Sequence, residues 1–289
     1  MPLTATEPRT CALQSLSAHG FHRVVYYEWG DADNRDVVVC VHGLARNGRD
    51  FDRLGERLAP RFRVIAVDMP GRGESEWLAN PADYVLATYL TTLTALFARV
   101  DAVRLAFVGT SMGGLHGMVL AAQRHTPVAR LVVNDVGPVL EPAALARIAG
   151  YVGQSPVFDS YTDIEHYIRT VSAPFGDLGD AGWAHIARTN VRQRADGRWR
   201  LAYDPGIAVP FAASAAIPDI WPTWDAIRCP TLVLRGAQSD LLSRATAEAM
   251  TARGPRARLH EFVGVGHAPM LIDDAQIDVV ATFLGEMSP

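Results

Sequence analysis

Short apolar runs recur along the chain and alternate with longer stretches of helical pattern. Six such runs are Val37–Val41, Val64–Val67, Leu105–Val108, Leu131–Val136, Thr231–Leu234 and Leu259–Val263. Several of them are apolar at successive positions rather than at every second one, which is typical of strands covered by helices on both faces. The alternation of strand and helix favours a parallel sheet. The pattern therefore predicts an α/β fold with a mostly parallel, doubly wound sheet.

The first apolar segment has a different pattern. Arg23–Trp29 alternates more strongly between polar and apolar residues, and the polar stretch Gly30–Asn34 leads from it to Val37. Such an alternation, followed by turn residues, is typical of a strand at the edge of a sheet. We therefore expect an antiparallel edge hairpin before the parallel strands.

The strand rhythm breaks between Pro138 and Trp221 and resumes at Thr231. The interrupted stretch contains three helix-like segments, Ala143–Val152, Ile164–Ser172 and Trp183–Val191. The simplest account is a core of residues 1–137 and 222–289 with a helical lid of residues 138–221 inserted into it. The turn Asp196–Trp199 and the short extended piece after it indicate that the lid is not purely helical.

Composition narrows the classes of protein further. The chain has 289 residues, of which 49% are hydrophobic and 20% charged, as in ordinary globular proteins. Its 27 basic and 31 acidic residues give a net charge of −4, which disfavours nucleic-acid and anionic-membrane partners. The apolar runs are shorter than the roughly 18 residues of a membrane-spanning helix. The first residues lack the pattern of a secretory signal, so a cytoplasmic location is expected. Cys11, Cys40 and Cys229 show no paired spacing and are interpreted as free thiols.

The strongest chemical signal follows the run Leu105–Val108. The sequence there reads Gly109-Thr110-Ser111-Met112-Gly113, and a stretch with the pattern of a buried helix comes next. In a strand–turn–helix of this kind the serine adopts a strained backbone that only very small neighbours permit, and its hydroxyl stands above the sheet. The helix that begins directly after Ser111 directs free N–H groups and its positive end at the same place. This context predicts Ser111 as a nucleophile.

A serine nucleophile needs an imidazole base and a carboxylate that orients the base. Asp240 and His267 each follow a predicted strand, and active sites of parallel sheets form at the carboxyl ends of strands. Asp135 is the competing acid, because it follows the run Leu131–Val133; its alternative role is to cap the turn after it. We prefer Asp240, because it has a strand run of its own and precedes a helical segment near Ser243.

Two further motifs extend these observations. His42-Gly43-Leu44 follows one strand run, and a second run leads into Asp68-Met69-Pro70-Gly71-Arg72-Gly73-Glu74-Ser75. Together with the serine motif they make the sequence resemble the α/β-hydrolase family over nearly its whole length. The resemblance implies Ser111 as nucleophile, Asp240 as acid and His267 as base. It also implies an oxyanion hole formed by the backbone N–H groups of Leu44 and Met112, and a cap at the place of the lid.

Substrate contacts are less strongly indicated. Arg46 follows the oxyanion loop and could reach a carboxylate or carbonyl of a substrate, and a solvated loop is the alternative. Trp183 is one of several tryptophans in and around the lid that could line an apolar acyl pocket, or could pack the lid on the core. No histidines and acids share the spacing of metal ligands, so we expect no metal and no cofactor.

These observations lead to one function and two alternatives. The expected protein is a serine hydrolase that cleaves a small carboxylic ester, thioester or lactone through an acyl-enzyme on Ser111. A hydrolase that cleaves carbon–carbon bonds of ring-fission diketones would use the same three residue types. A non-catalytic receptor of the same fold would bind a small molecule under the lid. Nothing in the sequence distinguishes a monomer from a dimer.

Overall fold

A computed structural model of the protein describes residues 7–213 and 219–287. Residues 1–6, 214–218 and 288–289 lie outside the described residues. Five residues of the expected lid, 214–218, are therefore among those that the structure does not describe.

The core of the molecule is an eight-stranded sheet with the order β1-β2-β4-β3-β5-β6-β9-β10. Its strands are β1 (Arg9–Ser17), β2 (Gly20–Trp29), β3 (Asp36–Val41), β4 (Arg63–Val67), β5 (Arg104–Thr110), β6 (Val128–Asn134), β9 (Thr231–Gly236) and β10 (Arg258–Phe262). From β4 to β10 every neighbouring pair is parallel. Each of the six apolar runs overlaps a strand, so the α/β fold expected from the sequence is confirmed.

The antiparallel edge differs from the expectation. The segment β2 pairs with β1 over the register Arg9↔Glu28 to Ser17↔Gly20, and its other neighbour is β4. An antiparallel hairpin thus does form the edge before the parallel strands, but it joins β2 to β1, and the expected continuation of Arg23–Trp29 into a paired strand at Val37 is wrong. Much of β1 is exposed, in line with its position at the edge, and its sequence lacks a continuous apolar run. That absence explains why the strand was not recognised.

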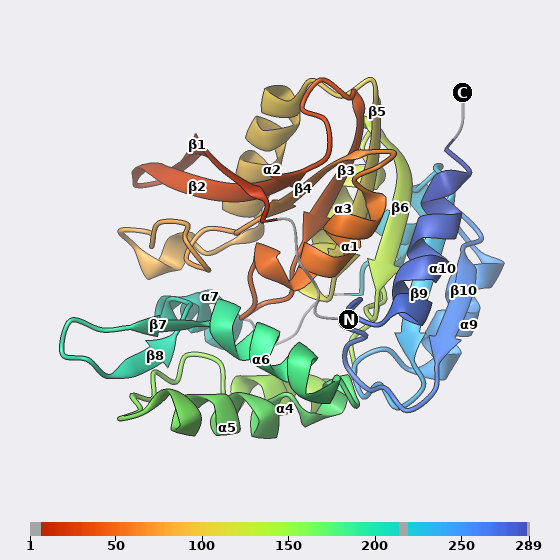
Figure 1. The fold of residues 1–289 in the computed structure, drawn as a ribbon. Helices are drawn as coiled ribbons and strands as arrows, with labels where there is room; N and C mark the ends of the chain where they lie inside the picture. Colours follow the sequence, from red (N-terminus) through yellow and green to blue (C-terminus); the bar gives the residue numbers. More distant parts are fainter. Residues whose placement is uncertain (1–6, 214–218, 288–289) are drawn as a thin grey trace.

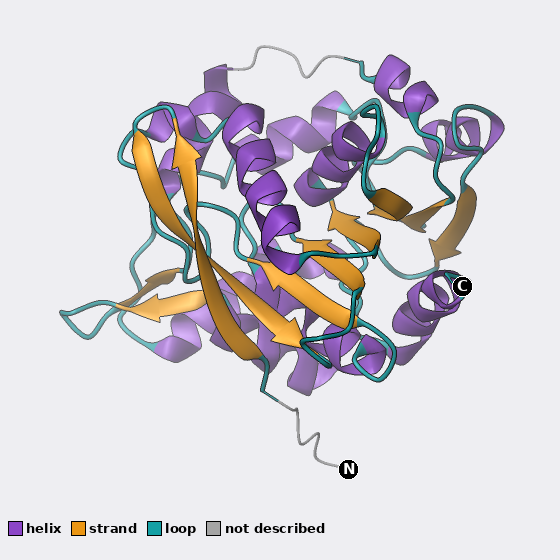
Figure 2. Cartoon of the chain, turned by 90° about the horizontal axis from the view of Figure 1, so that it is seen from above, coloured by secondary structure: helices purple, strands orange, loops and turns teal. Residues whose placement is uncertain are grey.

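Helices cover both faces of the sheet (Figures 1 and 2). The helices outside the lid are α1 (Asp52–Leu58), α2 (Leu86–Val100), α3 (Met112–Ala121), α8 (Trp221–Ala226), α9 (Arg244–Ala252) and α10 (Asp274–Gly285). Alternate residues of each central strand enter different cores. In β3, Val39 packs in the cluster that contains α2 and α3, whereas Cys40 packs in the cluster that contains α1 and α10. Burial on both faces is the physical reason for the unbroken apolar runs.

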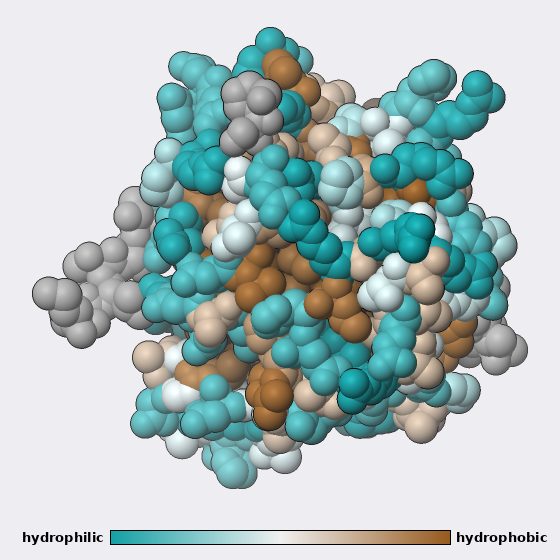
Figure 3. Space-filling model, turned by 90° about the vertical axis from the view of Figure 1, so that its right-hand side faces the viewer, coloured by the Kyte–Doolittle hydropathy of each residue, from teal (hydrophilic) through white to brown (hydrophobic). Residues whose placement is uncertain are grey.

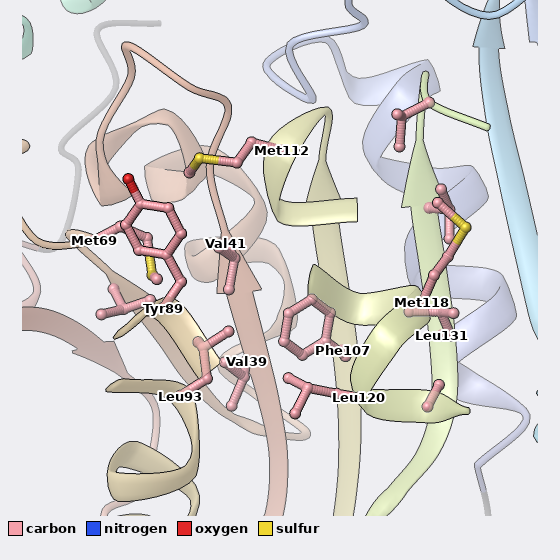
Figure 4. Close-up of a cluster of buried hydrophobic side chains, with 14 of the residues drawn as sticks. Val39, Val41, Met69, Tyr89, Leu93, Phe107, Met112, Met118, Leu120 and Leu131 are labelled. Carbon is pink, nitrogen blue, oxygen red and sulfur yellow. The ribbon is translucent and has the colours of Figure 1, made fainter. Parts of the chain in front are cut away.

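Figure 4 shows part of the larger cluster beneath the carboxyl end of the sheet. Phe107 of β5 packs there with Leu93 of α2 and Met118 of α3, and all three side chains are fully buried. A core of this kind holds the strand ends in place, because each large buried side chain contacts several neighbours. The loops at the strand ends are thus supported by a well-packed base.

The segment between β6 and α8 forms a second layer beyond the carboxyl ends of the central strands (Figure 1). It contains α4 (Pro142–Ala149), α5 (Tyr161–Val171), α6 (Gly179–Thr189), α7 (Ala208–Ala213) and a two-stranded sheet of β7 (Val191–Gln193) and β8 (Trp199–Leu201). Three of these helices correspond to the expected helical segments. Ile164 of α5 and Ile186 of α6 belong to a small hydrophobic cluster that also includes Met270 of the main body.

The surface of the molecule is mostly polar and carries scattered apolar side chains. Figure 3 shows the side of the molecule on the right of Figure 1, where hydrophobic residues gather near the middle within a hydrophilic surround. The most exposed large apolar side chains, Phe21, Val103 and Val263, lie on or next to different elements of the chain. Within the described part of the chain, no helix combines the length and the apolar character that crossing a bilayer requires.

Candidate active site

Ser111 occupies the sharp turn between β5 and α3. Its backbone angles are φ 54° and ψ −116°, a conformation that side-chain-bearing residues rarely adopt. A Cβ on Gly109 would lie 2.3 Å from the carbonyl oxygen of Gly113, and a Cβ on Gly113 would lie 2.1 Å from that of Val41. Glycine is therefore required on both sides of the serine by close backbone packing. The Ser111 N–H donates to the carbonyl of Asn134 at 2.9 Å, which fixes the turn against β6.

A continuous chain of hydrogen bonds connects Ser111, His267 and Asp135. Ser111 Oγ lies 3.0 Å from His267 Nε2, and His267 Nδ1 lies 2.7 Å from Asp135 Oδ2. Because an ionised carboxylate only accepts, Nδ1–H donates to Asp135 and Nε2 is left to accept from the serine hydroxyl. This tautomer is the one that can remove a proton from Ser111.

Asp240 does not take part in this chain, and the expectation that it orients His267 is wrong in the structure. Its carboxylate instead accepts from Arg147 Nε at 2.6 Å and Nη2 at 2.8 Å, where Arg147 belongs to α4. The Asp240 side chain is 43% exposed, whereas Asp135 is fully buried. Asp135 follows β6 directly, and β6 is the immediate neighbour of the strand that leads to Ser111. The position of Asp135 directly after a strand run was visible in the sequence, whereas the adjacency of β6 and β5 is decided by the sheet order.

The buried carboxylate of Asp135 is fully supplied with donors. The N–H of Gly236 donates to Oδ1 at 2.9 Å, and Ser239 Oγ donates to Oδ2 at 2.7 Å beside His267. Burying a charge without such partners would be costly. The loop after β9 therefore contributes donors to the acid rather than the acid itself. Sequence reasoning did not find Ser239, because its role depends on contact with a residue about a hundred positions away.

His42 orders the loop that carries Leu44. Its Nδ1–H donates to the carbonyl of Gly43 at 2.7 Å, and its Nε2 accepts from the N–H of Met69 at 3.0 Å. Burial lowers the pKa of His42 to about 3, so the ring stays neutral and Nε2 stays an acceptor. Leu44 lines the cavity in front of Ser111. Met112 is the first residue of α3, where backbone N–H groups have no partner within the helix.

A fully buried arginine lies behind this loop. Arg72 Nε donates to the carbonyl of Leu44 at 2.9 Å, and its Nη1 donates to the carbonyl of Pro70 and to Tyr89 Oη. Its Nη2 lies 3.8 Å from the sulfur of Met112, whose side chain extends toward the hydroxyl end of Tyr89 in Figure 4. No carboxylate among the described residues forms an ion pair with Arg72. Both residues expected to form the oxyanion hole thus contact one buried cation.

Asn134 connects the two loops that carry the nucleophile and the histidine. Its Nδ2 donates to Thr110 Oγ1 at 3.0 Å and to the carbonyl of Pro269 at 2.7 Å. On the other side of the histidine, the N–H of Gly266 donates at 2.7 Å to the carbonyl of Pro174, which lies between α5 and α6. The position of His267 is therefore set both from the central sheet and from the segment between β6 and α8.

A cavity of about 120 Å³ opens onto Ser111 and His267. Its walls combine the loop after His42 with apolar and aromatic side chains of residues 138–221, including Ile148, Tyr151, Tyr167, Ile168, Val171, Phe175, Leu201 and Tyr203. Arg46 belongs to the lining, as expected for a residue that follows the oxyanion loop. Trp183 does not belong to it: the ring is nearly buried in the lid, with the Arg169 guanidinium 5.9 Å from its centroid. The structure therefore does not place Trp183 at the cavity where a substrate contact was expected.

The cysteines and the possible metal ligands were considered in the sequence analysis. Cys11, Cys40 and Cys229 are free cysteines in the structure. In residues 7–213 and 219–287, no group of three or more His, Cys, Asp and Glu side chains is arranged to hold a metal ion.

Comparison with known proteins places this geometry in a family. The sequence model of the Alpha/beta hydrolase family matches residues 38–282. The 3-hydroxybutyrate-oligomer hydrolase of Cupriavidus necator is 42% identical, and the alignment covers 96% of this chain and 98% of that protein. The crystal structure of an alpha/beta hydrolase from Novosphingobium aromaticivorans is 37% identical and superposes with a TM-score of 0.87 over 96% of this chain and 98% of that one.

A more distant relative has another named substrate. The 2-(acetamidomethylene)succinate hydrolase of Mesorhizobium japonicum is 29% identical over 75% of this chain and 76% of that protein. The family match extends over most of the chain, and the fold and the serine turn agree with it. The chain belongs to the alpha/beta hydrolase family.

Proposed function

We propose that the protein is a serine hydrolase that cleaves the ester bonds of short 3-hydroxybutyrate-type oligomers. The observation that carries the chemistry is the hydrogen-bonded chain from Ser111 through His267 to the buried Asp135. The choice of ester is supported by the similarity to the Cupriavidus necator enzyme over nearly the whole of both chains.

The mechanism follows from the positions of these groups. His267 Nε2 removes the proton of Ser111 as Oγ attacks the ester carbonyl, and Asp135 stabilises the imidazolium that forms. The negative oxygen of the tetrahedral intermediate is bound by the N–H groups of Leu44 and Met112. His267 then protonates the departing alcohol, and a water activated by the same imidazole releases the acid from the acyl-enzyme. Removal of one oxyanion donor in such sites typically costs about 10² to 10³ in kcat.

The cavity suits a short and partly apolar substrate. A cavity of roughly this volume can hold a small organic group. Its lid residues offer apolar and tyrosine surfaces that could pack against the methyl branches of hydroxybutyrate units. We further propose that residues 138–221 act as a lid, because they supply one wall of the cavity and the carbonyl of Pro174 that holds the His267 loop.

Labelling with a fluorophosphonate tests the nucleophile directly. Intact-mass measurement is expected to show one adduct on the wild type and none on Ser111→Ala. Ser172→Ala removes another serine of the cavity wall and serves as the matched control, which is expected to keep the adduct. An adduct that persists in Ser111→Ala would contradict the assignment.

Turnover of a defined set of substrates tests the reaction class. The wild type is expected to hydrolyse p-nitrophenyl butyrate and the linear dimer and trimer of 3-hydroxybutyrate, and Ser111→Ala is expected to lose at least 10³-fold in kcat for each. Cleavage of a ring-fission diketone without cleavage of these esters would instead favour carbon–carbon hydrolysis. Tight ligand binding with no turnover of any ester would favour a receptor.

A further inference from the structure

One guanidinium group lies in the cavity wall beside the nucleophile. Arg46 is the only basic side chain of the arginine or lysine type among the described residues that line the cavity. Arg46 Cγ and Ser111 Cβ each lie 3.6 Å from the position that a Cβ on Gly43 would take. The Arg46 stem and Ser111 therefore approach Gly43 at the same point, and both residues line the same cavity.

Asp50 and Phe175 fix the orientation of this guanidinium. The Asp50 carboxylate accepts from Arg46 Nε at 2.9 Å and from Arg46 Nη2, and the Phe175 ring centroid lies 5.5 Å from Arg46 Cζ. The side chains of Arg46 and Asp50 are only 15% and 9% exposed. A guanidinium has five N–H donors in a planar fork, so two carboxylates can bind at two of its edges. Asp50 occupies one edge, and Nη1 has no hydrogen-bond partner among the described residues.

We propose that the open edge of Arg46 binds a free carboxylate on the alcohol portion of the substrate. This inference rests on the proposed ester hydrolysis and specifies which esters are preferred. In a chain of 3-hydroxybutyrate units, the terminal carboxylate carbon stands four bonds from the carbonyl carbon of the last ester, a separation of about 5 Å. The enzyme then cleaves the ester next to the carboxylate end and releases one hydroxy acid at a time.

The surroundings of Arg46 strengthen this selectivity. Most of the cavity wall is apolar, and charge-assisted hydrogen bonds gain strength where water is partly excluded. Asp50 repels an incoming carboxylate, so only a carboxylate placed on the far edge of the guanidinium is attracted. The ion pair thus favours one position of the substrate's charge rather than negative charge in general.

A matched pair of substrates isolates the carboxylate. One is the linear dimer of 3-hydroxybutyrate, and the other is the same dimer with its terminal carboxylate converted to a primary amide, which has nearly the same shape and no charge. Release of 3-hydroxybutyrate or of its amide is followed by chromatography. The measured quantity is the ratio of kcat/KM for the acid to kcat/KM for the amide. The wild-type ratio is expected to be at least tenfold and to fall as the salt concentration rises.

Three variants separate recognition from structural effects. Arg46→Met is expected to lower the ratio at least tenfold, mainly through KM of the acid, and Arg46→Lys is expected to keep part of it. Arg46→Met also uncovers the Asp50 charge, which could by itself repel the acid. The double variant Arg46→Met with Asp50→Asn removes that repulsion and is expected to keep the low ratio.

The outcomes distinguish this inference from the proposed function. Equal losses for acid and amide in Arg46→Met, or recovery of the wild-type ratio in the double variant, would overturn the inference while ester hydrolysis stands. A wild-type ratio near one would overturn it in the same way. Absence of both the fluorophosphonate adduct and p-nitrophenyl butyrate turnover would overturn the proposed function, and the inference with it.

Discussion

The loops after β6 and β9 end neighbouring strands of one sheet, and each contains an aspartate with a different fate. Asp135 is fully buried and hydrogen-bonded to His267, whereas Asp240 is exposed and paired with Arg147 of α4. Residue type and strand end were the same for both in the sequence. The difference shows that two things decide whether a carboxylate becomes part of such a site: how many residues separate it from the strand end, and which donors surround it.

The geometry of the two loops explains the outcome. Asp135 comes directly after β6 and adopts φ 56°, and its N–H donates to the carbonyl of Leu234 in β9 at 2.8 Å. Asp240 lies four positions beyond the end of β9, so the chain has already turned outward toward α4. Gly236 and Ser239, which lie closer to the strand end, are the residues that reach the site. One loop supplies the charge and the other stabilises it.

The largest expected effect comes from removing the charge of Asp135. Asp135→Asn is expected to lower kcat for p-nitrophenyl butyrate by about 10³ to 10⁴, because an amide can hold His267 in the tautomer that cannot accept the Ser111 proton. Steady-state kinetics at constant pH measure the loss. Asp240→Asn is the matched control and is expected to stay within about threefold of the wild type. A larger loss in Asp240→Asn than in Asp135→Asn would reverse the comparison.

An intermediate effect is expected from the loop that supports the acid. Ser239→Ala removes one donor from the Asp135 carboxylate and leaves the N–H of Gly236 in place. Loss of a hydrogen bond to a charged group corresponds to about a tenfold decrease in kcat, with KM little changed. Ser239→Thr retains the hydroxyl and is expected to recover most of the rate. Equal rates for Ser239→Ala and the wild type would show that this loop is structural only.

The smallest effect concerns the stability contributed by Asp240. The hydrogen bond from Arg147 lowers the pKa of Asp240, so the folded state favours its ionised form. This contribution is present above the ordinary pKa of an aspartate and is lost as the pH falls through the lowered value. Because the pair is partly exposed, Asp240→Asn is expected to cost less than about 1 kcal/mol of unfolding free energy at pH 7.

Urea unfolding at a series of pH values measures this difference. It is expected to stay constant between pH 7 and about pH 5 and to shrink at lower pH. Arg147→Met, and Arg147→Met combined with Asp240→Asn, are expected to cost about the same as Asp240→Asn alone. A cost that grows as the pH falls would contradict the assigned direction of the pKa shift.

Much of the fold could be read from the sequence. The parts that were missed are those for which the local sequence carries little or no pattern. The central strands were recognisable because burial on both faces requires apolar residues at successive positions. The edge strand β1 faces solvent and has no such requirement, so its pattern was weak. Trp183 was named as a possible substrate contact because it is one of several tryptophans in and around residues 138–221, and the structure favours the other interpretation, in which it packs away from the cavity. Nothing local in the sequence distinguishes those two positions for a tryptophan.

The sequence by itself determined the central strands and the serine turn, because both depend mainly on steric and burial requirements of residues close together in the chain. Gly109 must be glycine because of the Gly113 carbonyl in the same turn, whereas Gly113 faces the carbonyl of Val41, which only the fold brings there. Tertiary structure alone decided which aspartate faces His267 and where the charges of Arg46 and Arg72 lie. Those outcomes depend on strand order and on contacts between distant segments, since a charged side chain is stabilised by the donors and acceptors that folding brings to it.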